Sequence, residues 1–348
     1  MRAVAYQQPS FPVSSASLND IDLPVPKPAG RDLLVEVKAV AINPVDTKVR
    51  SRRKPDDGEW VVLGWDVAGV VTAVGPDATD FKVGDQVYYA GHQDRQGGNA
   101  QYQCVDERIV ARKPARLTFP EAAALPLTMI TAWEMLFDRL EIERRVAGQA
   151  PVILIVGGAG GVSSAAIQLV RQMTDLKIIA TASSSQSREW VESMGAHFVV
   201  DHSKPLAEQV IGLGLGEPSF IFSTTMTDRH VGELAKVIAP QGRFGLIDDP
   251  DNFDVGLFKR KAASIHWEYM FVRPLFATPD VAEVGRLLGK VADMIDAGAL
   301  RTTLGENLGP INAENLIRGH AMIEAGRVRG KLVLEGFALT AKEQVANA

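Results

Sequence analysis

The chain of 348 residues has a single cysteine, no excess of basic residues and no long apolar run. Each of these absences excludes a class of protein. Its one cysteine, Cys104, excludes an internal disulfide and a zinc site built from several thiolates, and it indicates a cytoplasmic protein. Lys and Arg total 37 against 42 Asp and Glu, so no basic surface for nucleic acid is expected. No stretch reaches the roughly 20 apolar residues of a membrane span, and the start lacks the apolar run of a signal peptide. The expected partners therefore include neither nucleic acid nor a membrane.

Short β-branched runs, interrupted by Gly and Pro, fill the first third of the chain and favour a small antiparallel barrel. From residue 122 the pattern becomes helical, and apolar runs of strand length then alternate with helical stretches. Such alternation is typical of an α/β fold, a doubly wound parallel sheet with helices on both faces. The strand-like runs of this part are residues 151–156, 177–182, 197–201, 219–223 and 243–248. Helices are then expected over residues 279–298 and 313–325, before a last strand within 330–337 and a loosely held, Ala-rich end.

The most informative motif is a glycine-rich turn between an apolar strand and a helix. Such a turn lets the backbone approach a pyrophosphate, which the free N–H groups and the dipole of the helix N-terminus stabilise. Gly158, Gly160 and Gly161 supply the tight turn, and Ser163 replaces the last Gly of the G-x-G-x-x-G pattern, which predicts slightly wider packing of helix on strand. The alternative is a plain strand-to-helix turn. We predict a dinucleotide site with contacts at Gly158, Ala159, Gly160, Gly161 and Val162.

The end of the second strand of this half indicates which dinucleotide binds. The run KIIATA is followed by Ser183, Ser184 and Ser185, with no Asp or Glu to hold a ribose 2′-hydroxyl and repel a 2′-phosphate. NADPH is therefore expected in preference to NADH. Hydroxyls of Ser183 and Ser184 and the guanidinium of Arg188 are candidates to bind the phosphate through charge-assisted hydrogen bonds. The alternative is that Ser183 caps the following helix and Arg188 is a solvated surface charge.

Several motifs in order resemble one known family. They are INPVDTKVR at 42–50, LGWDVAGVV at 63–71, VGDQVYYAG at 83–91, the glycine turn, and GRVRGKLVLEGF at 326–337. The chain resembles the medium-chain dehydrogenase/reductase superfamily, in its zinc-independent quinone oxidoreductase (zeta-crystallin-like) branch, and most closely the subgroup labelled zinc-type alcohol dehydrogenase-like protein. The resemblance implies a Rossmann domain inserted in a GroES-like β-barrel catalytic domain. Its expected boundaries are 1–124 for the first part of the catalytic domain, 125–267 for the Rossmann domain and 268–348 for the return.

The residues argue against zinc despite the subgroup's label. Asn43 stands where zinc-dependent relatives place a ligand Cys, and Trp65 stands where they place a His. An amide and an indole do not make a zinc site, which needs thiolate, imidazole or carboxylate donors. No metal is therefore expected. Without a Lewis acid, reduction of a simple ketone is hard, whereas a quinone or enone spreads the developing charge along its conjugated system.

The expected function is NADPH-dependent hydride transfer to quinones or other conjugated carbonyls. Two alternatives remain open. An enoyl-thioester reductase would use the basic run at Arg50, Arg52, Arg53 and Lys54 to hold coenzyme, although such a run is also typical of a solvated loop. The second alternative is a protein that binds NADPH but catalyses no reaction.

The resemblance also implies individual site residues. Asn43 is expected as an amide donor to nicotinamide or substrate, or else as a turn former before Pro44. Asp46 and Thr47 follow on a short helix at the cleft, and either Tyr88 or Tyr89 is expected to line the substrate pocket while the other is core. His202 is expected near the adenosine phosphate or as a helix cap, and Lys331 either near the cofactor or as a solvated strand-end charge. The expected catalytic residues are Asn43, Asp46 and Tyr89, and the further cofactor contacts are Thr47, Thr128, His202, Thr224, Leu246, Ile247, Asp248, Met270, Phe271 and Lys331.

The segment over 253–267 is too apolar for a free loop. Unpaired N–H and C=O groups of an edge strand pair readily with a symmetry mate, and subunits of the resembled family join their Rossmann sheets in this way. We therefore expect a homodimer centred on this segment. The alternative is that the segment only covers the Rossmann core of a monomer.

Overall fold

The computed structural model describes residues 1–337, which form two compact units. Unit 1 combines Met1–Leu127 with the chain from Phe271 onward, and unit 2 is Thr128–Met270. The boundaries fall at 127/128 and 270/271, where the sequence placed them at 124/125 and 267/268. The polar, Ala-rich end predicted after Phe337 lies outside the described residues.

The strands of unit 1 form a three-stranded sheet in the order β2-β1-β4 and a seven-stranded sheet in the order β15-β16-β3-β5-β6-β8, with β7 pairing to β3. The region predicted as a barrel is thus arranged as two sheets, bridged at Ala3 and Ala100. The strands are β1 (Arg2–Tyr6), β2 (Asn19–Asp22), β3 (Asp32–Ile42), β4 (Val61–Val62), β5 (Asp66–Val74), β6 (Gln86–Ala90), β7 (Tyr102–Asp106), β8 (Val110–Arg112), β15 (Leu304–Asn307) and β16 (Lys331–Glu335).

The helices of unit 1 lie in its loops and in the return segment. Strands β15 and β16 are parallel because the chain crosses back through α10 between them. The helical elements are α1 (Pro44–Arg52), η1 (Glu107–Ile109), α2 (Phe119–Ala123), α8 (Val272–Leu275), α9 (Glu283–Asp296) and α10 (Ala313–Glu324). The two longest, α9 and α10, lie within the helical stretches expected from the sequence.

The predicted long helical pattern from residue 122 is divided. Helix α2 ends at Ala123, α3 (Pro126–Trp133) begins with a proline, and a π-helical turn, η2 (Glu134–Arg139), follows. Pro126 explains the break, because proline has no N–H to continue a helix but is well suited to a first turn.

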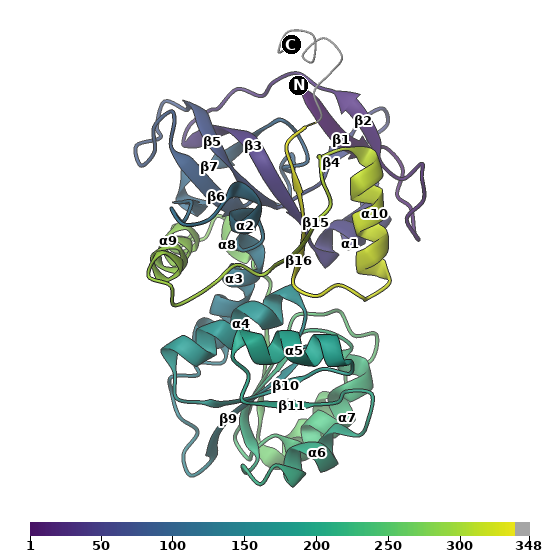
Figure 1. Ribbon diagram of the computed structural model, residues 1–348, viewed down its shortest axis with the longest axis vertical. Helices are drawn as coiled ribbons and strands as arrows, with labels where there is room; N and C mark the ends of the chain where they lie inside the picture. The colour runs from purple at the N-terminus through teal and green to yellow at the C-terminus, as the bar shows by residue number, and fades with distance from the viewer. Residues whose placement is uncertain (338–348) are drawn as a thin grey trace. The chain divides into compact units, whose positions relative to one another are not determined.

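Unit 2 is a six-stranded parallel sheet in the order β11-β10-β9-β12-β13-β14, so the expected Rossmann fold is confirmed. Helices α4 and α5 cover one face and α6 and α7 the other (Figure 1). The strands are β9 (Ala150–Val156), β10 (Lys177–Thr181), β11 (Phe198–Val200), β12 (Pro218–Ser223), β13 (Arg243–Leu246) and β14 (Ser264–Trp267). The helices are α4 (Gly161–Met173), α5 (Ser185–Met194), α6 (Leu206–Gly212), α7 (Thr227–Val237) and η3 (Val255–Lys261).

Apolar side chains of the strands and of the inner helix faces form the core of unit 2. Phe258 of η3 is fully buried there and packs on Phe244 with ring centroids 4.9 Å apart. The apolar segment over 253–267 therefore covers core with part of its length, while Trp267 remains 53% exposed. Within residues 1–337, no helix is both long and apolar enough to cross a bilayer.

Candidate functional site

The glycine turn of unit 2 has a backbone that only glycine fits at two positions. Gly157 has φ +78°, and a Cβ there would lie 2.7 Å from Oγ1 of Thr224. A Cβ on Gly158 would lie 2.8 Å from the carbonyl oxygen of Thr181. Gly160 caps α4, which begins at Gly161. The turn therefore brings bare backbone to the N-terminus of a thirteen-residue helix, the geometry that holds a pyrophosphate. Gly157, which opens the glycine run, was not among the predicted contacts.

Thr224 lies where the strand order reverses. The chain leaves β9 toward β10 and returns to its other neighbour, β12, so the switch point of the sheet lies between β9 and β12. The Thr224 hydroxyl at the end of β12 donates to the Val156 carbonyl, 2.8 Å away, and lies 3.0 Å from Oγ of Ser163. Dinucleotides bind at such switch points in open α/β sheets. Ser163, the sixth residue of the glycine pattern, thereby links α4 to the ends of both strands.

Thr181 connects the glycine turn to His202, a contact that the sequence analysis missed. Its Oγ1 accepts from the Gly157 N–H at 3.0 Å and lies 3.1 Å from Nδ1 of His202. Burial lowers the pKa of His202, and the Asp201 carboxylate offsets this only in part, so the ring is neutral near pH 7. Helix α6 begins after Pro205, which corrects the alternative that His202 caps a helix.

At the end of β10, Ser183 and Ser184 differ in role. Ser184 is the N-cap of α5 and accepts from the Ser187 N–H at 3.1 Å, which corrects the alternative that Ser183 is the cap. Ser183 is exposed. Arg188 lies on the first turn of α5 and donates from Nη1 to the Val199 carbonyl at 2.9 Å, so it is not simply a solvated charge. This edge of the sheet presents hydroxyls and a guanidinium, and no carboxylate follows the strand directly.

The remaining residues of unit 2 that were expected to contact the cofactor differ in burial and in whether their side chains are already hydrogen-bonded. Asp248 uses its carboxylate to hold the start of α7, accepting from the N–H and the hydroxyl of Thr227 at 2.9 and 2.5 Å. Leu246 ends β13 and is buried, and Ile247 follows it at the carboxyl edge of the sheet. Thr128 and Met270 are buried at the two ends of the unit.

In unit 1, a buried polar network gathers around Lys331, which is only 3% exposed. Its ammonium donates to the Ile42 carbonyl at 2.9 Å, to Oδ2 of Asp66 at 2.8 Å and to Oδ1 of Asn43. Nδ2 of Asn43 donates to the same Asp66 oxygen at 2.8 Å, and the Leu127 N–H donates to the other at 2.7 Å. Lys331 is therefore buried and bonded, which corrects the alternative that it is a solvated strand-end charge; its approach to the cofactor stays a prediction. Asp66 was not among the expected site residues, although a carboxylate within the apolar run LGWDVAGVV indicates a buried charge that needs a partner.

Asp46 lies beside this network at the start of α1. Its carboxylate accepts from the N–H groups of Asn43 and Gly64 at 2.8 and 3.0 Å. Complete burial raises the pKa of Asp46 to about 7, against the lowering effect of the Asn43 N–H and the Lys331 ammonium. Asp46 thus positions the turn that carries Asn43.

Two expected catalytic side chains are used inside unit 1. The Asn43 amide is 1% exposed and bonded at both ends, so it is a member of the buried network, and its expected contact with nicotinamide or substrate stays a prediction. Tyr89 is fully buried, and its hydroxyl donates to Oε1 of Gln103 at 3.0 Å; its expected place in a substrate pocket is corrected. Thr47 is buried and bonded to the Pro44 carbonyl. Phe271 packs edge-on against Trp65, with centroids 5.8 Å apart.

The residues around Asn43 do not fit zinc. The donors at hand are an amide, an indole and a carboxylate, and the Asp66 carboxylate is already paired with an ammonium that would repel a divalent cation. No cluster of three or more His, Cys, Asp or Glu side chains suited to a metal occurs among residues 1–337.

Comparisons with known proteins agree with this architecture. Residues 29–115 match the family described as "Alcohol dehydrogenase GroES-like domain", and residues 194–334 match "Zinc-binding dehydrogenase". A crystal structure from Rhizobium etli CFN 42, presented as a candidate zinc-dependent alcohol dehydrogenase, is 61% identical with a TM-score of 0.95, covering 97% of this chain and 99% of that one.

Two further relatives have names that differ in how specifically they describe an activity. A zinc-type alcohol dehydrogenase-like protein of Staphylococcus aureus strain MSSA476 is 35% identical over 337 residues, 96% of this chain and 99% of its own. The chloroplastic NADPH-dependent alkenal/one oxidoreductase of Arabidopsis thaliana is 39% identical over 194 residues, 53% of this chain and 49% of its own. With its GroES-like unit and Rossmann unit, the chain belongs to the medium-chain dehydrogenase/reductase superfamily, among the zinc-type alcohol dehydrogenase-like proteins.

Proposed function

We propose that the protein is an NADPH-dependent reductase that transfers hydride to quinones or other conjugated carbonyls without zinc. The observation that carries the proposal is the glycine turn at the switch point of the unit 2 sheet, next to a β10 end with serines and no acidic residue. The name of the Arabidopsis relative, an NADPH-dependent alkenal/one oxidoreductase, supports the same cofactor and a conjugated substrate.

NADPH supplies the hydride, and the chain supplies its binding site. The turn at Gly157 and Gly158 would hold the pyrophosphate, with the hydroxyl of Thr224 beside it. Ser183 and Arg188 would hold the 2′-phosphate, since both lie at the carboxyl end of β10 and no carboxylate opposes them there. A conjugated acceptor suits a protein whose residues at Asn43 and Trp65 do not fit a metal, because charge spreads over the acceptor itself.

A parallel assay of NADPH oxidation tests the reaction. A small quinone, an enone and an enoyl thioester are offered separately, each with and without a strong chelator. We expect turnover of the quinone or enone and no loss of rate with the chelator. Turnover of the thioester alone would instead identify an enoyl-thioester reductase, and loss of activity that returns with Zn²⁺ would contradict a metal-free site. Cofactor binding without turnover of any acceptor would identify a non-catalytic NADPH-binding protein.

The structure weakens the basis of the thioester alternative. Of the basic run near the end of α1, Arg50 is fully buried and paired with Glu324, and Arg53 donates to the Gln93 carbonyl. These two guanidiniums are held by the protein and are poorly placed to form a groove for coenzyme phosphates.

Cofactor preference gives a second test. We expect NADPH to bind about tenfold or more tightly than NADH, equivalent to about 1.4 kcal/mol, and Arg188→Ala to narrow the difference. Titration of tryptophan fluorescence measures both affinities. Arg260→Ala is the matched control, because Arg260 is an exposed arginine of η3. The next residue, Lys261, accepts a hydrogen bond at its carbonyl from the Gln241 N–H, which lies before the amino end of β13 and so at the edge of the sheet opposite to the carboxyl edge. Equal affinities for the two cofactors in the unaltered protein would refute the assignment.

We also propose a homodimer that joins through β14. This strand is at one end of the unit 2 sheet and pairs with β13 alone among the described strands. Exposed Val255, Leu257 and Trp267 lie on and before it, and Trp267 packs edge-on against Phe253 with ring centroids 6.3 Å apart. An open edge beside exposed apolar side chains is suited to an isologous contact.

A further inference from the structure

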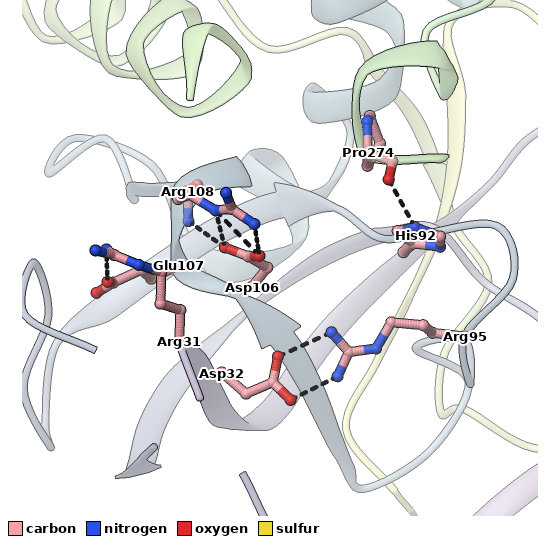
Figure 2. Close-up of polar contacts among 8 residues, drawn as sticks. All are labelled: Arg31, Asp32, His92, Arg95, Asp106, Glu107, Arg108 and Pro274. Atoms are coloured by element: carbon pink, nitrogen blue, oxygen red, sulfur yellow. Dashed lines mark hydrogen bonds and ion pairs between the residues drawn. The ribbon is translucent and has the colours of Figure 1, made fainter. Parts of the chain in front are cut away.

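A cavity of about 170 Å³ opens beside β7 in unit 1. Its lining comes from three places in the chain: the loop after β6, the stretch from β7 into η1, and the residues from α8 to the start of α9. It shares no lining residue with the network of Asn43, Asp66 and Lys331. Figure 2 shows the polar residues around it, with Arg108 paired to Asp106, Arg95 paired to Asp32, and His92 bonded to Pro274.

Two guanidiniums line the cavity with donors to spare. Arg95 donates from both Nη atoms to Asp32, at 2.8 Å each. Arg108 donates to Asp106 from Nε at 3.0 Å and from Nη2 at 2.7 Å. An arginine has five N–H donors. Among residues 1–337, Nε of Arg95 and Nη1 of Arg108 have no acceptor, so both side chains keep N–H groups that a ligand could use.

The other polar groups of the lining are neutral. The Asp94 N–H donates to Nδ1 of His92 at 3.1 Å, so the ring proton is on Nε2 and is donated to the Pro274 carbonyl at 3.0 Å. Burial and the Asp32 carboxylate raise the pKa of the Cys104 thiol to about 11, so it carries no charge at neutral pH. The charged groups of the wall are thus the two guanidiniums, each paired with one carboxylate: Arg95 with Asp32 and Arg108 with Asp106.

The rest of the wall is apolar. Pro274, Ala277 and Val281 lie on the return segment, and Val105 and Ile109 lie on the side of β7 and η1. An apolar cavity of about 150 Å³ accommodates benzene. The volume here therefore limits a ligand to roughly the size of one aromatic ring with a small polar group.

We propose that this cavity binds a small monocarboxylate with an apolar body, such as an aromatic or short-chain acid. The carboxylate accepts from the spare N–H groups of Arg95 and Arg108, and the apolar body packs on Pro274, Ala277 and Val281. The spare N–H groups belong to charged guanidiniums and form charge-assisted hydrogen bonds with an anion, which favours a monocarboxylate over a neutral ligand or a cation. The cavity is lined by residues of unit 1 and shares none with the glycine turn of unit 2, and the proposal does not depend on which substrate the protein reduces.

Calorimetric titration of the full chain, without cofactor, tests the proposal with three probes. Benzoate is expected to bind at one site per chain. Benzamide has the same shape but no charge, and is expected to bind about tenfold more weakly because it lacks a charge-assisted bond. 2-Naphthoate keeps the charge but exceeds the volume, so no binding is expected. Equal binding of benzoate and benzamide, or tight binding of naphthoate, would contradict the assignment.

Substitutions then place the site. Arg108→Met should weaken benzoate binding by about tenfold or more. Arg112→Met is the matched control, since Arg112 lies on the neighbouring β8, is paired with Asp85 and does not line the cavity; binding should be unchanged. Val281→Phe fills the apolar side without altering charge and should abolish binding, which keeps the test valid if Arg108→Met folds poorly. If Val281→Phe binds benzoate as the unaltered chain does, the ligand lies elsewhere and the proposal fails.

Discussion

At the scale of single residues, the environment of Lys331 explains how unit 1 holds a charge in its interior. The ammonium has three oxygen acceptors, one for each of its protons, and one of them is the buried carboxylate of Asp66. Removing two charges from water is expensive, and a close pair with further hydrogen bonds offsets that cost. The pair also orients the Asn43 amide, whose oxygen faces the ammonium and whose nitrogen faces the carboxylate.

The first prediction concerns this pair. Asp66→Asn and Lys331→Met should each lower the free energy of unfolding by about 3–5 kcal/mol, because each leaves the partner's charge buried and unpaired. The double substitution should cost clearly less than the sum, by about 1–3 kcal/mol. Urea unfolding followed by tryptophan fluorescence measures all three. Arg112→Met removes the more exposed ion pair with Asp85 and should change stability by less than about 1 kcal/mol. Additive effects of the two buried substitutions would show that Lys331 and Asp66 are not coupled.

At the scale of elements, α1 and α10 pack through an unusual polar contact. Arg50 of α1 is fully buried and paired with Glu324 of α10, and the Tyr6 hydroxyl donates to the Val49 and Arg53 carbonyls at the end of α1. One turn before Glu324, His320 is fully buried, and neither of its ring nitrogens has a partner among the described residues. Burial, with a smaller contribution from Arg50, lowers the pKa of His320 to about 3.

The second prediction follows from His320. Its pKa is about 3 in the folded chain, against 6.5 for an unperturbed histidine, so between these pH values the unfolded chain binds one more proton. The contribution of His320 to the free energy of unfolding is fully present above pH 6.5. It falls by up to about 1.4 kcal/mol per pH unit as the pH is lowered toward 3. His320→Leu should flatten the acid side of the stability profile, measured by urea unfolding from about pH 7 to about pH 4.

A control is needed because Asp46 acts in the opposite direction. Its pKa is raised to about 7, so its contribution is fully present below pH 3.8 and is lost as the pH rises through 7. Asp46 is unaltered in His320→Leu, and the difference between the two profiles therefore isolates the histidine. A His320→Leu profile parallel to that of the unaltered chain would show that His320 does not control acid sensitivity.

At the scale of the whole molecule, the open β14 edge leads to the third prediction. Light scattering at micromolar concentration should give twice the 37.6 kDa mass of one chain. Trp267→Lys should raise the dimer dissociation constant by about thirtyfold or more, since large aromatic side chains supply much of the binding energy of an interface. Phe276→Lys alters another exposed aromatic, which belongs to unit 1, and should leave the dimer intact. A mass near that of one chain would refute the dimer.

Much of the fold was predictable because it rests on local patterns. The five strand-like runs of unit 2 and its glycine turn depend on apolar periodicity and on glycine itself, and each of these runs matches a strand of the sheet to within two residues at either end. The serines after β10 were also visible in the sequence. The particular cap was not, because Ser183 and Ser184 are alike in composition and differ only in where α5 begins.

The sequence by itself determined the order of strands and helices, the glycine turn and the lack of zinc ligands at Asn43 and Trp65, since these depend on residue type and short spacing. Only the tertiary structure decided the surroundings of single polar groups. Lys331 and Asp66 are 265 residues apart, and nothing local to either one indicates the partner. The same holds for Arg50 with Glu324 and for the wall of the cavity beside β7, which joins residues from the first third of the chain to the return segment. Long-range pairing sets the burial of a charge, and burial sets what that charge can do.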